Sequence, residues 1–257
     1  MSATQFEVFY REAGKKDASV VLLLHGFPTS SFQYRNLITK LAGDYRVIAP
    51  DYPGFGFTKV PETRNYEYTF DNLAKTIEAF VDALSLKKYA MYIFDYGAPV
   101  GLRLARSRPS AITAIVSQNG NAFREGFGDR WKPIFRYWEE PTLANRQAIG
   151  YVTTFNAKKN QRIPPETYHL DQALMDRAGN VDIQLDLFLN YRTNVAAYPS
   201  FQEYLREHQP PLLAIWGKND ISFIPREPRH SKLHFPLENH LDEIASEMIA
   251  FLKRNGV

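Results

Sequence analysis

Asp95 is the residue of this chain whose position best suits a nucleophile. It lies in the run Phe94-Asp95-Tyr96-Gly97-Ala98, between a predicted strand at 89–94 and a predicted helix at 97–106. Such a sharp strand-to-helix turn needs a nearly side-chain-free residue two positions after its centre, and Gly97 meets that need. A carboxylate in the turn can attack a carbon that bears a leaving group and form an alkyl ester. The alternative is that Asp95 only caps the helix that follows it.

Two other segments repeat the arrangement of a buried strand that runs into a Gly/Pro-rich loop. Residues 20–24 lead into His25-Gly26-Phe27-Pro28, and residues 47–50 lead into Asp51-Tyr52-Pro53-Gly54-Phe55-Gly56. Short apolar strands of this kind are typical of a parallel sheet, which delivers the loops after its strands to one edge. The three loops are therefore expected to meet at one edge of the sheet.

The loops HGFP, DYPGFG and DYG, in this order, resemble those of the α/β-hydrolase superfamily, and in particular its Asp-nucleophile branch of epoxide hydrolases and haloalkane dehalogenases. The resemblance covers nearly the whole chain. It implies an α/β fold with a mainly parallel sheet flanked by helices, and a helical cap inserted between two core strands.

The periodicity of the chain agrees with such an insertion. Strand patterns at 6–10 and 112–117, and a helix at 71–84 with Asp71 available as its cap, precede a helical, aromatic-rich stretch. Strand-type periodicity returns only at 211–216, before a last helix at about 238–252. We predict a core of residues 1–121 and 198–257 and a cap of residues 122–197, with cap helices at 130–139, 142–153 and 182–191.

Hydrolysis of an alkyl ester needs a base that activates water and an acid that orients the base. The resemblance places the acid at Asp220, after the strand that ends at Trp216, and the base at His234, in the turn before the last helix. Some dehalogenases carry the acid after the preceding strand, but residues 118–121 contain no carboxylate. The competing histidines lie outside the motif position: His25, His169, His208, His230 and His240.

The interval between the predicted acid and base is short. Only 14 positions separate Asp220 from His234, whereas a parallel crossover alone takes about a dozen residues, and a final strand and a turn must also fit. Residues 225–230 contain two prolines and cannot form that strand, whereas 232–235 could, with His234 inside it. Either the molecule carries more residues in this interval, or its histidine loop is trimmed and disabled.

The oxyanion of the ester intermediate would be bound by the backbone N–H groups of Phe27 and Tyr96. Haloalkane dehalogenases commonly place side-chain N–H donors at these positions, so Phe27 weakens a haloalkane interpretation. Epoxide opening needs an acid for the leaving oxygen, and Tyr191 resembles the cap tyrosine that supplies it in epoxide hydrolases. A second tyrosine is expected from Tyr137 or Tyr151, and the residues expected to line the pocket are His25, Tyr137, Trp138 and Tyr151.

One position departs from the family pattern. The residue two before the nucleophile is usually small, often glycine, and here it is Ile93. A β-branched side chain at this place crowds the following helix and requires a modified turn.

Length and composition narrow the classes of protein that fit. The chain has 257 residues, enough for one α/β domain with an insertion. Its net charge of +3 comes from 31 basic and 28 acidic residues without a long single-sign run, so neither nucleic acid nor a membrane surface is expected as a partner. Because there is no cysteine, a disulfide framework or thiolate metal site is excluded. No apolar run reaches the length of a membrane span, and we expect a cytoplasmic enzyme.

The leading hypothesis is an epoxide hydrolase-like enzyme that acts on a small apolar substrate through an alkyl ester on Asp95, without a cofactor or metal. The first alternative is a haloalkane dehalogenase-like hydrolase with the same mechanism. The second is a catalytically impaired α/β-hydrolase relative that binds a small apolar ligand under the cap.

Overall fold

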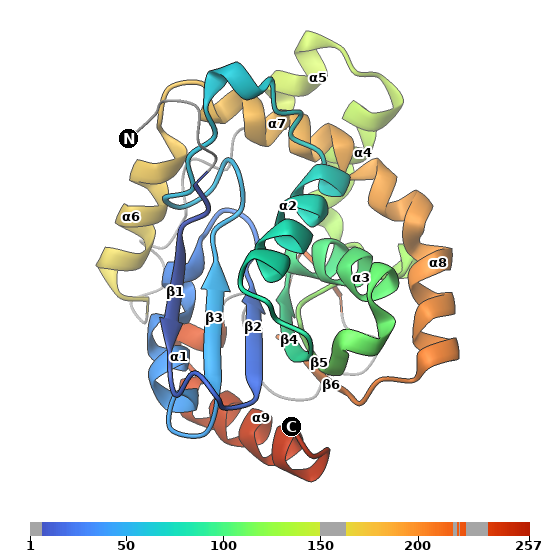
Figure 1. Ribbon diagram of the computed structural model, residues 1–257. Coiled ribbons are helices and arrows are strands. Elements are labelled where there is room, and N and C mark those ends of the chain that lie inside the picture. Colours follow the sequence, from blue (N-terminus) through green and yellow to red (C-terminus); the bar gives the residue numbers. More distant parts are fainter. Residues whose placement is uncertain (1–6, 150–162, 218–219, 221, 225–235) are drawn as a thin grey trace.

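The computed structural model describes residues 7–149, 163–217, 220, 222–224 and 236–257 (Figure 1). Within them a single sheet has the strand order β1-β3-β2-β4-β5-β6. All neighbouring strands are parallel except β1, which pairs antiparallel with β3. The strands are β1 (Tyr10–Ala13), β2 (Val20–Leu24), β3 (Arg46–Pro50), β4 (Tyr89–Phe94), β5 (Ile112–Gln118) and β6 (Leu212–Ile215). The predicted mainly parallel α/β fold is confirmed.

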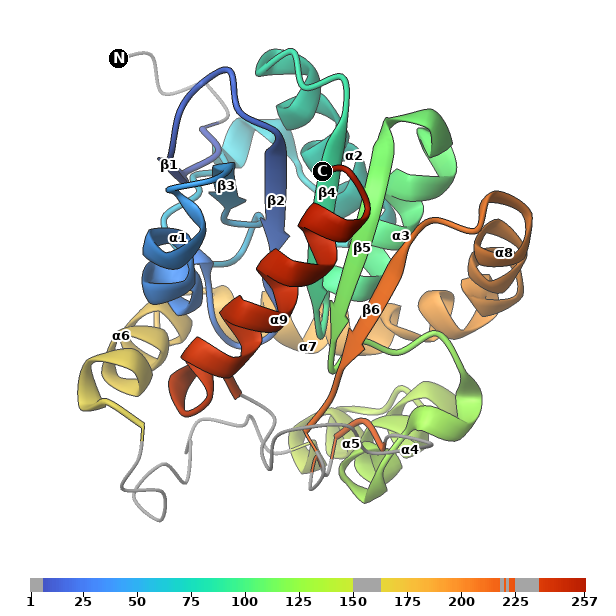
Figure 2. The ribbon, with the colours of Figure 1, turned by 90° about the horizontal axis from the view of Figure 1, so that it is seen from below.

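Helices cover both faces of this sheet, as Figure 2 shows. Because successive side chains of a strand point to opposite faces, Leu22 and Leu24 belong to one apolar core, and Val21 and Leu23 belong to the other. The first core is closed by α2 (Phe70–Ala83), α3 (Gly97–Ser107) and α8 (Arg192–His208), and the second by α1 (Arg35–Leu41) and α9 (Leu241–Arg254). The central strands are thus buried on both faces, which explains their uninterrupted apolar sequences.

The helices inserted between β5 and β6 are α4 (Lys132–Glu139), α5 (Leu143–Ala148), α6 (Pro165–Met175) and α7 (Asn180–Asn190), followed by α8. Figure 1 shows α4, α5 and α7 beyond the carboxyl ends of the strands, where the Gly/Pro-rich loops emerge. Residue 197, the predicted end of the cap, falls inside α8, which returns along α3 to the core. The division into core and cap stays a prediction.

Two local predictions are wrong. The edge strand begins at Tyr10 instead of residue 6, because ladder pairing with β3 starts there and Phe9 donates its N–H to the Thr58 hydroxyl (3.0 Å). The cap of α2 is Thr69, whose hydroxyl accepts from Asn72 N (3.2 Å), whereas Asp71 lies in the first turn of the helix.

Neither α6 nor α8 was predicted from the sequence. Pro199 lies inside α8, and because a proline removes one helix hydrogen bond, its presence disfavours the prediction of a helix through this position. Among the described residues, no helix is both long and apolar enough to cross a membrane.

Candidate active site

Asp95 lies in a strained turn between β4 and α3. Its φ is +50°, a left-handed conformation that non-glycine residues seldom adopt. A Cβ on Gly97 would lie 2.1 Å from the carbonyl oxygen of Leu24, and a Cβ on Gly26 would lie 2.3 Å from the Cβ of Asp95. Both glycines therefore allow the turn to approach β2 and the loop after it.

The structure also accommodates Ile93. A Cβ on Gly101, one turn into α3, would lie 2.5 Å from the Cγ2 of Ile93. The space that the β-branched side chain needs is provided by a glycine on the facing helix, which the sequence analysis did not connect with it.

Two backbone amides point to one oxygen of Asp95. Phe27 N and Tyr96 N each donate to Asp95 Oδ1 at 2.7 Å, and Asp95 is only 6% exposed. These are the two residues predicted for the oxyanion hole, and the structure brings both to the predicted nucleophile. Dipoles fixed around one oxygen in a site shielded from water stabilise negative charge on that oxygen.

Tyr191 lies among aromatic side chains next to this turn. Its ring centroid is 4.5 Å from that of Trp131, 5.2 Å from Phe70 and 5.7 Å from Tyr96. Burial raises the pKa of Tyr191 well above its ordinary value, and the Tyr198 hydroxyl and the charge of Asp95 raise it further. The hydroxyl is therefore protonated at neutral pH and can only give a proton to a base formed during reaction.

The other predicted cap residues differ in where they lie. Trp138 stacks parallel to Tyr191, with an interplanar angle of 9°, and donates its ring N–H to the carbonyl of Phe188 (2.6 Å). The hydroxyl of Tyr137 accepts from Arg146 (3.0 Å), which also pairs with Asp182 and Asp186 on α7. Tyr137 is therefore part of a polar contact between the inserted helices. Tyr151 lies outside the described residues.

Tyr198 is the tyrosine that the sequence analysis missed. It lies seven residues after Tyr191, about two helical turns along α8, and is 2% exposed. Burial raises its pKa, and the Tyr191 hydroxyl acts in the opposite direction. The spacing of the two tyrosines on one face of a helix was the available signal.

The predicted acid, Asp220, is held by a residue of the neighbouring strand end. Asn119 donates its side-chain N–H to Asp220 Oδ2 (2.5 Å), and Ser222 N donates to Asp220 Oδ1 (2.8 Å). Since β5 and β6 are parallel, Asn119 and Asp220 emerge at the same edge of the sheet. Asn119 lies in the segment 118–121, which contains no carboxylate, and its amide instead supports the acid from the next strand.

His25 is a structural residue of the loop after β2. Its Nε2 accepts from Tyr52 N (3.1 Å), so its proton is on Nδ1, which lies 3.1 Å from the carbonyl of Gly26. Burial lowers the pKa of His25, which keeps the ring neutral. Both ring nitrogens are thus engaged, and His25 cannot serve as the base. The predicted base, His234, lies outside the described residues.

An apolar hollow of about 670 Å³ lies along β6. It is bordered by Leu102 and Leu205 on the helices of one face, by Leu213 on the strand, and by Glu243 and Glu247 of α9. The hollow therefore lies along the last described strand of the sheet, and Tyr191 and Asp95 are not among the residues that line it. No group of three or more potential metal ligands occurs among the residues that the structure describes.

The profile of the family described as alpha/beta hydrolase fold matches residues 19–253. The chain belongs to the α/β-hydrolase family. It is 44% identical to an uncharacterized hydrolase of Saccharomyces cerevisiae, over 97% of this chain and 94% of the yeast protein. That alignment runs over 275 residues, more than the 257 of this chain, so the yeast hydrolase carries residues that have no counterpart here.

Other proteins that are similar to the present chain are named after specific reactions. The present chain is 35% identical to a cis-3-alkyl-4-alkyloxetan-2-one decarboxylase of Shewanella oneidensis, over 90% of this chain and 81% of that protein. It is 28% identical to a haloalkane dehalogenase of Mycobacterium marinum, over 96% and 81%.

Two solved structures share the fold of this hydrolase. One is a haloalkane dehalogenase from Bradyrhizobium elkani, with a TM-score of 0.74, 21% identity, and coverage of 99% of this chain and 97% of that one. The other is named a "putative epoxide hydrolase" from Pseudomonas aeruginosa, with a TM-score of 0.76, 17% identity, and coverage of 98% and 96%. At these identities the likeness concerns the fold alone.

Proposed function

We propose that this hydrolase opens small apolar epoxides through an alkyl ester on Asp95. The observation that carries the proposal is the pair of N–H groups, from Phe27 and Tyr96, that donate to one oxygen of the Asp95 carboxylate. These two hydrogen bonds fix the orientation of the carboxylate, so its other oxygen, Oδ2, points in a defined direction. The same two amides would then bind the oxyanion when water attacks the ester.

In the first step, Asp95 Oδ2 forms a bond to an epoxide carbon. The carbon–oxygen bond of the ring breaks, its electron pair goes to the oxygen, and that oxygen takes the proton of the Tyr191 hydroxyl. Tyr191 suits this role because burial keeps its hydroxyl protonated until a strongly basic alkoxide forms beside it.

In the second step, a base removes a proton from water, and the water oxygen adds to the carbonyl carbon of the ester, which is Cγ of Asp95. We assign the base to His234 and its orientation to Asp220. Collapse of the intermediate releases a vicinal diol and restores the carboxylate. Of the two protons of water, one ends on the product oxygen and one restores the Tyr191 hydroxyl.

An epoxide fits the surroundings of Asp95 better than a haloalkane does. Halide departs as an anion that side-chain N–H groups must stabilise, and the residues that flank Asp95 Oδ1 offer only backbone N–H groups there. Trp138 and Trp216 already donate their ring N–H groups to the carbonyls of Phe188 and Phe223. The tyrosine hydroxyl supplies the proton that an epoxide requires.

A second candidate function is supported by the short interval between Asp220 and His234. A chain without room for a crossover and a final strand would bind an apolar ligand without turnover. The longer yeast alignment shows that this relative has residues that the present chain lacks.

Intact mass spectrometry of the variant His234→Gln tests the proposed function directly. Without its base the enzyme should accumulate the ester, so incubation with styrene oxide should add the mass of one epoxide, and the double variant with Asp95→Ala should add none. An adduct formed only with 1-bromobutane would support a dehalogenase. Absence of both adducts would support the ligand binder.

A further inference from the structure

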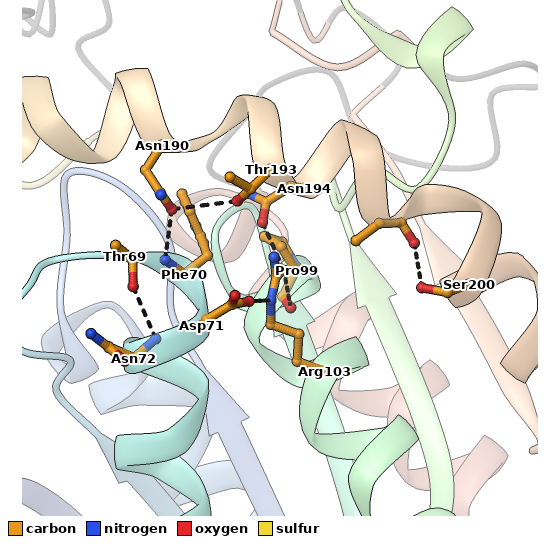
Figure 3. Close-up of polar contacts among 11 residues, drawn as sticks. Thr69, Phe70, Asp71, Asn72, Pro99, Arg103, Asn190, Thr193, Asn194 and Ser200 are labelled. Carbon is orange, nitrogen blue, oxygen red and sulfur yellow. Dashed lines mark hydrogen bonds and ion pairs between the residues drawn. The ribbon is translucent and has the colours of Figure 1, made fainter.

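Two asparagines on either side of Tyr191 in the sequence, Asn190 and Asn194, contact α2 and α3, as Figure 3 shows. It lies at the junction where α7 ends at Asn190 and α8 begins at Arg192. Asn190 Oδ1 accepts from Phe70 N, the first amide of α2, at 2.9 Å. This bond satisfies one of the N–H groups that the start of a helix leaves unpaired.

The second anchor is Asn194, which follows Tyr191 by three residues on α8. Its Oδ1 accepts from Nη1 of Arg103 at 2.7 Å, and Asn194 is completely buried. Arg103 also donates to Asp71 Oδ1 (2.5 Å) and to the carbonyl of Pro99 (3.2 Å). Figure 3 shows how these groups join α2, α3 and α8.

Arg103 connects this anchor to the nucleophile. It lies on α3, which begins two residues after Asp95 and follows the strained turn without interruption. The segment that carries Tyr191 is therefore fixed to the helix that positions Asp95. Rigid elements with satisfied polar contacts hold side chains in a defined geometry more closely than free loops do.

We propose that Asn194 is a positioning residue that, through Arg103, fixes the Tyr191 hydroxyl relative to Asp95. This inference rests on the proposed function, in which Tyr191 gives its proton to the epoxide oxygen. Proton transfer requires the two oxygens to lie within hydrogen-bond reach when Oδ2 attacks. A displacement of about 1 Å can cost about 100-fold in rate.

The buried guanidinium of Arg103 needs the side-chain oxygen of Asn194 as a hydrogen-bond acceptor. The guanidinium is largely buried, and its N–H groups need oxygen partners that remain in place. Replacing Asn194 with leucine retains the approximate size but removes the acceptor, so an N–H group of a buried cation loses its partner. Replacing it with aspartate retains an acceptor oxygen at the same position.

The test compares single-turnover alkylation of Asp95 by styrene oxide with the slower alkylation by 1-bromobutane at high concentration, because the leaving bromide needs no proton. Asn194→Leu should slow alkylation by the epoxide about 10- to 100-fold, and alkylation by the bromoalkane less than threefold. Asn194→Asp should recover most of the epoxide rate. In the background of Tyr191→Phe, Asn194→Leu should have no further effect, because the group that it positions is absent.

Gln202→Leu is the matched control. Gln202 also lies on α8 and joins it to the segment after β5 by one side-chain hydrogen bond, to the carbonyl of Ala122 (2.8 Å), but that bond is remote from Tyr191 in the chain. This variant should leave the rate with the epoxide unchanged. Equal losses with both reagents, or an equal loss in Gln202→Leu, would show that Asn194 only stabilises the fold and would overturn the proposal.

A readout that does not depend on turnover separates this inference from the proposed function. We expect 3-fluorotyrosine at position 191 to give one narrow ¹⁹F resonance in the otherwise unchanged protein and in Gln202→Leu, and a shifted or divided resonance in Asn194→Leu. An unchanged resonance in Asn194→Leu would overturn the positioning role, even if the enzyme hydrolyses epoxides. Failure of both reagents to alkylate Asp95, with the expected ¹⁹F change, would overturn the proposed function alone.

Discussion

The two sides of the candidate site are built differently. On the nucleophile side, β4 lies between β2 and β5, and each of its six residues is buried. On the acid side, β6 pairs only with β5 within the described residues, and Leu212 at its start is 50% exposed. The nucleophile is thus enclosed by strands on both sides and is held from the loop after β2, 68 positions away, whereas Asp220 follows the last described strand and is held by Asn119, 101 positions away, and by Ser222.

Because of this difference, substitutions on the two sides should affect different steps of the reaction. Changes near Asp95 should affect bond formation with the substrate or the fold itself. Changes near Asp220 should affect only the later hydrolysis of the ester.

The largest effect is expected at the nucleophile. Asp95→Ala should lower epoxide turnover by roughly 10⁴-fold or more, because no other group can form the ester. Its cost in stability should be about 1–3 kcal/mol, since two buried amides lose their acceptor. Turnover and thermal unfolding should be measured on the same sample, and near-normal turnover would mean that the carboxylate is not the nucleophile.

Gly97→Ala should destabilise the nucleophile side by about 3 kcal/mol, because the new Cβ would meet the carbonyl of Leu24 at 2.1 Å. Gly43→Ala is the matched control, since its Cβ would have no neighbour within 4 Å; it should change the free energy of unfolding by less than about 0.5 kcal/mol. Urea denaturation measures both, and equal values for the two variants would refute the tight fit of the turn.

Asn119→Gly should act on the acid side only, because glycine tolerates the positive φ of this position (+48°). Without the side-chain N–H of Asn119, Asp220 loses a short hydrogen bond and orients the base less well, so hydrolysis of the ester should slow about 10- to 100-fold. Rapid-quench kinetics should show an unchanged alkylation rate and an ester that accumulates. A slower alkylation step with normal hydrolysis would contradict the assignment of Asp220.

Asp171 of α6 lies near Thr29 of the loop after β2 and near Glu238, just before α9. Burial raises the pKa of Asp171 to about 8, so between its unfolded value of 3.8 and about 8 the folded state holds more protons than the unfolded state. The free energy of unfolding should therefore fall as the pH rises through this window, by about 2–3 kcal/mol between pH 5 and pH 7. Asp171→Asn should remove this pH dependence of the free energy of unfolding. Urea denaturation of the unsubstituted protein and the variant at pH 5 and pH 7 checks it.

The smallest effect on stability is expected at the edge of the sheet. Leu212→Lys should change the free energy of unfolding by less than about 0.5 kcal/mol, yet reduce self-association, because a charge on an exposed apolar edge strand opposes pairing with another chain. Leu143→Lys, at a residue 70% exposed on α5, is the control. The scattered light intensity, which reports self-association, should decrease for Leu212→Lys only. An equal decrease in both variants would assign the effect to net charge.

The sequence contained most of what places Asp95. A strand, a glycine two residues after the nucleophile and a helix are all encoded within residues 89–107, and the fold followed from three such junctions in order. Phe27 was predicted as an oxyanion donor because its HGFP loop resembles that of the α/β-hydrolase family. Asp220 was predicted as the acid because it follows a strand at the place where the resemblance puts that acid.

Other features depend on contacts that no local pattern contains. Only the tertiary structure showed that Gly101 makes room for Ile93, that Tyr137 is engaged by Arg146, and that Asn119 supports Asp220. The physical reason is that sequence periodicity shows which face of an element is buried, but not which side chain of another element fills the space opposite it. Asp95 was therefore determined by its own neighbours in the chain, whereas the partners of Tyr191 and Asp220 were decided by the assembly of α2, α3, α8 and two adjacent strand ends.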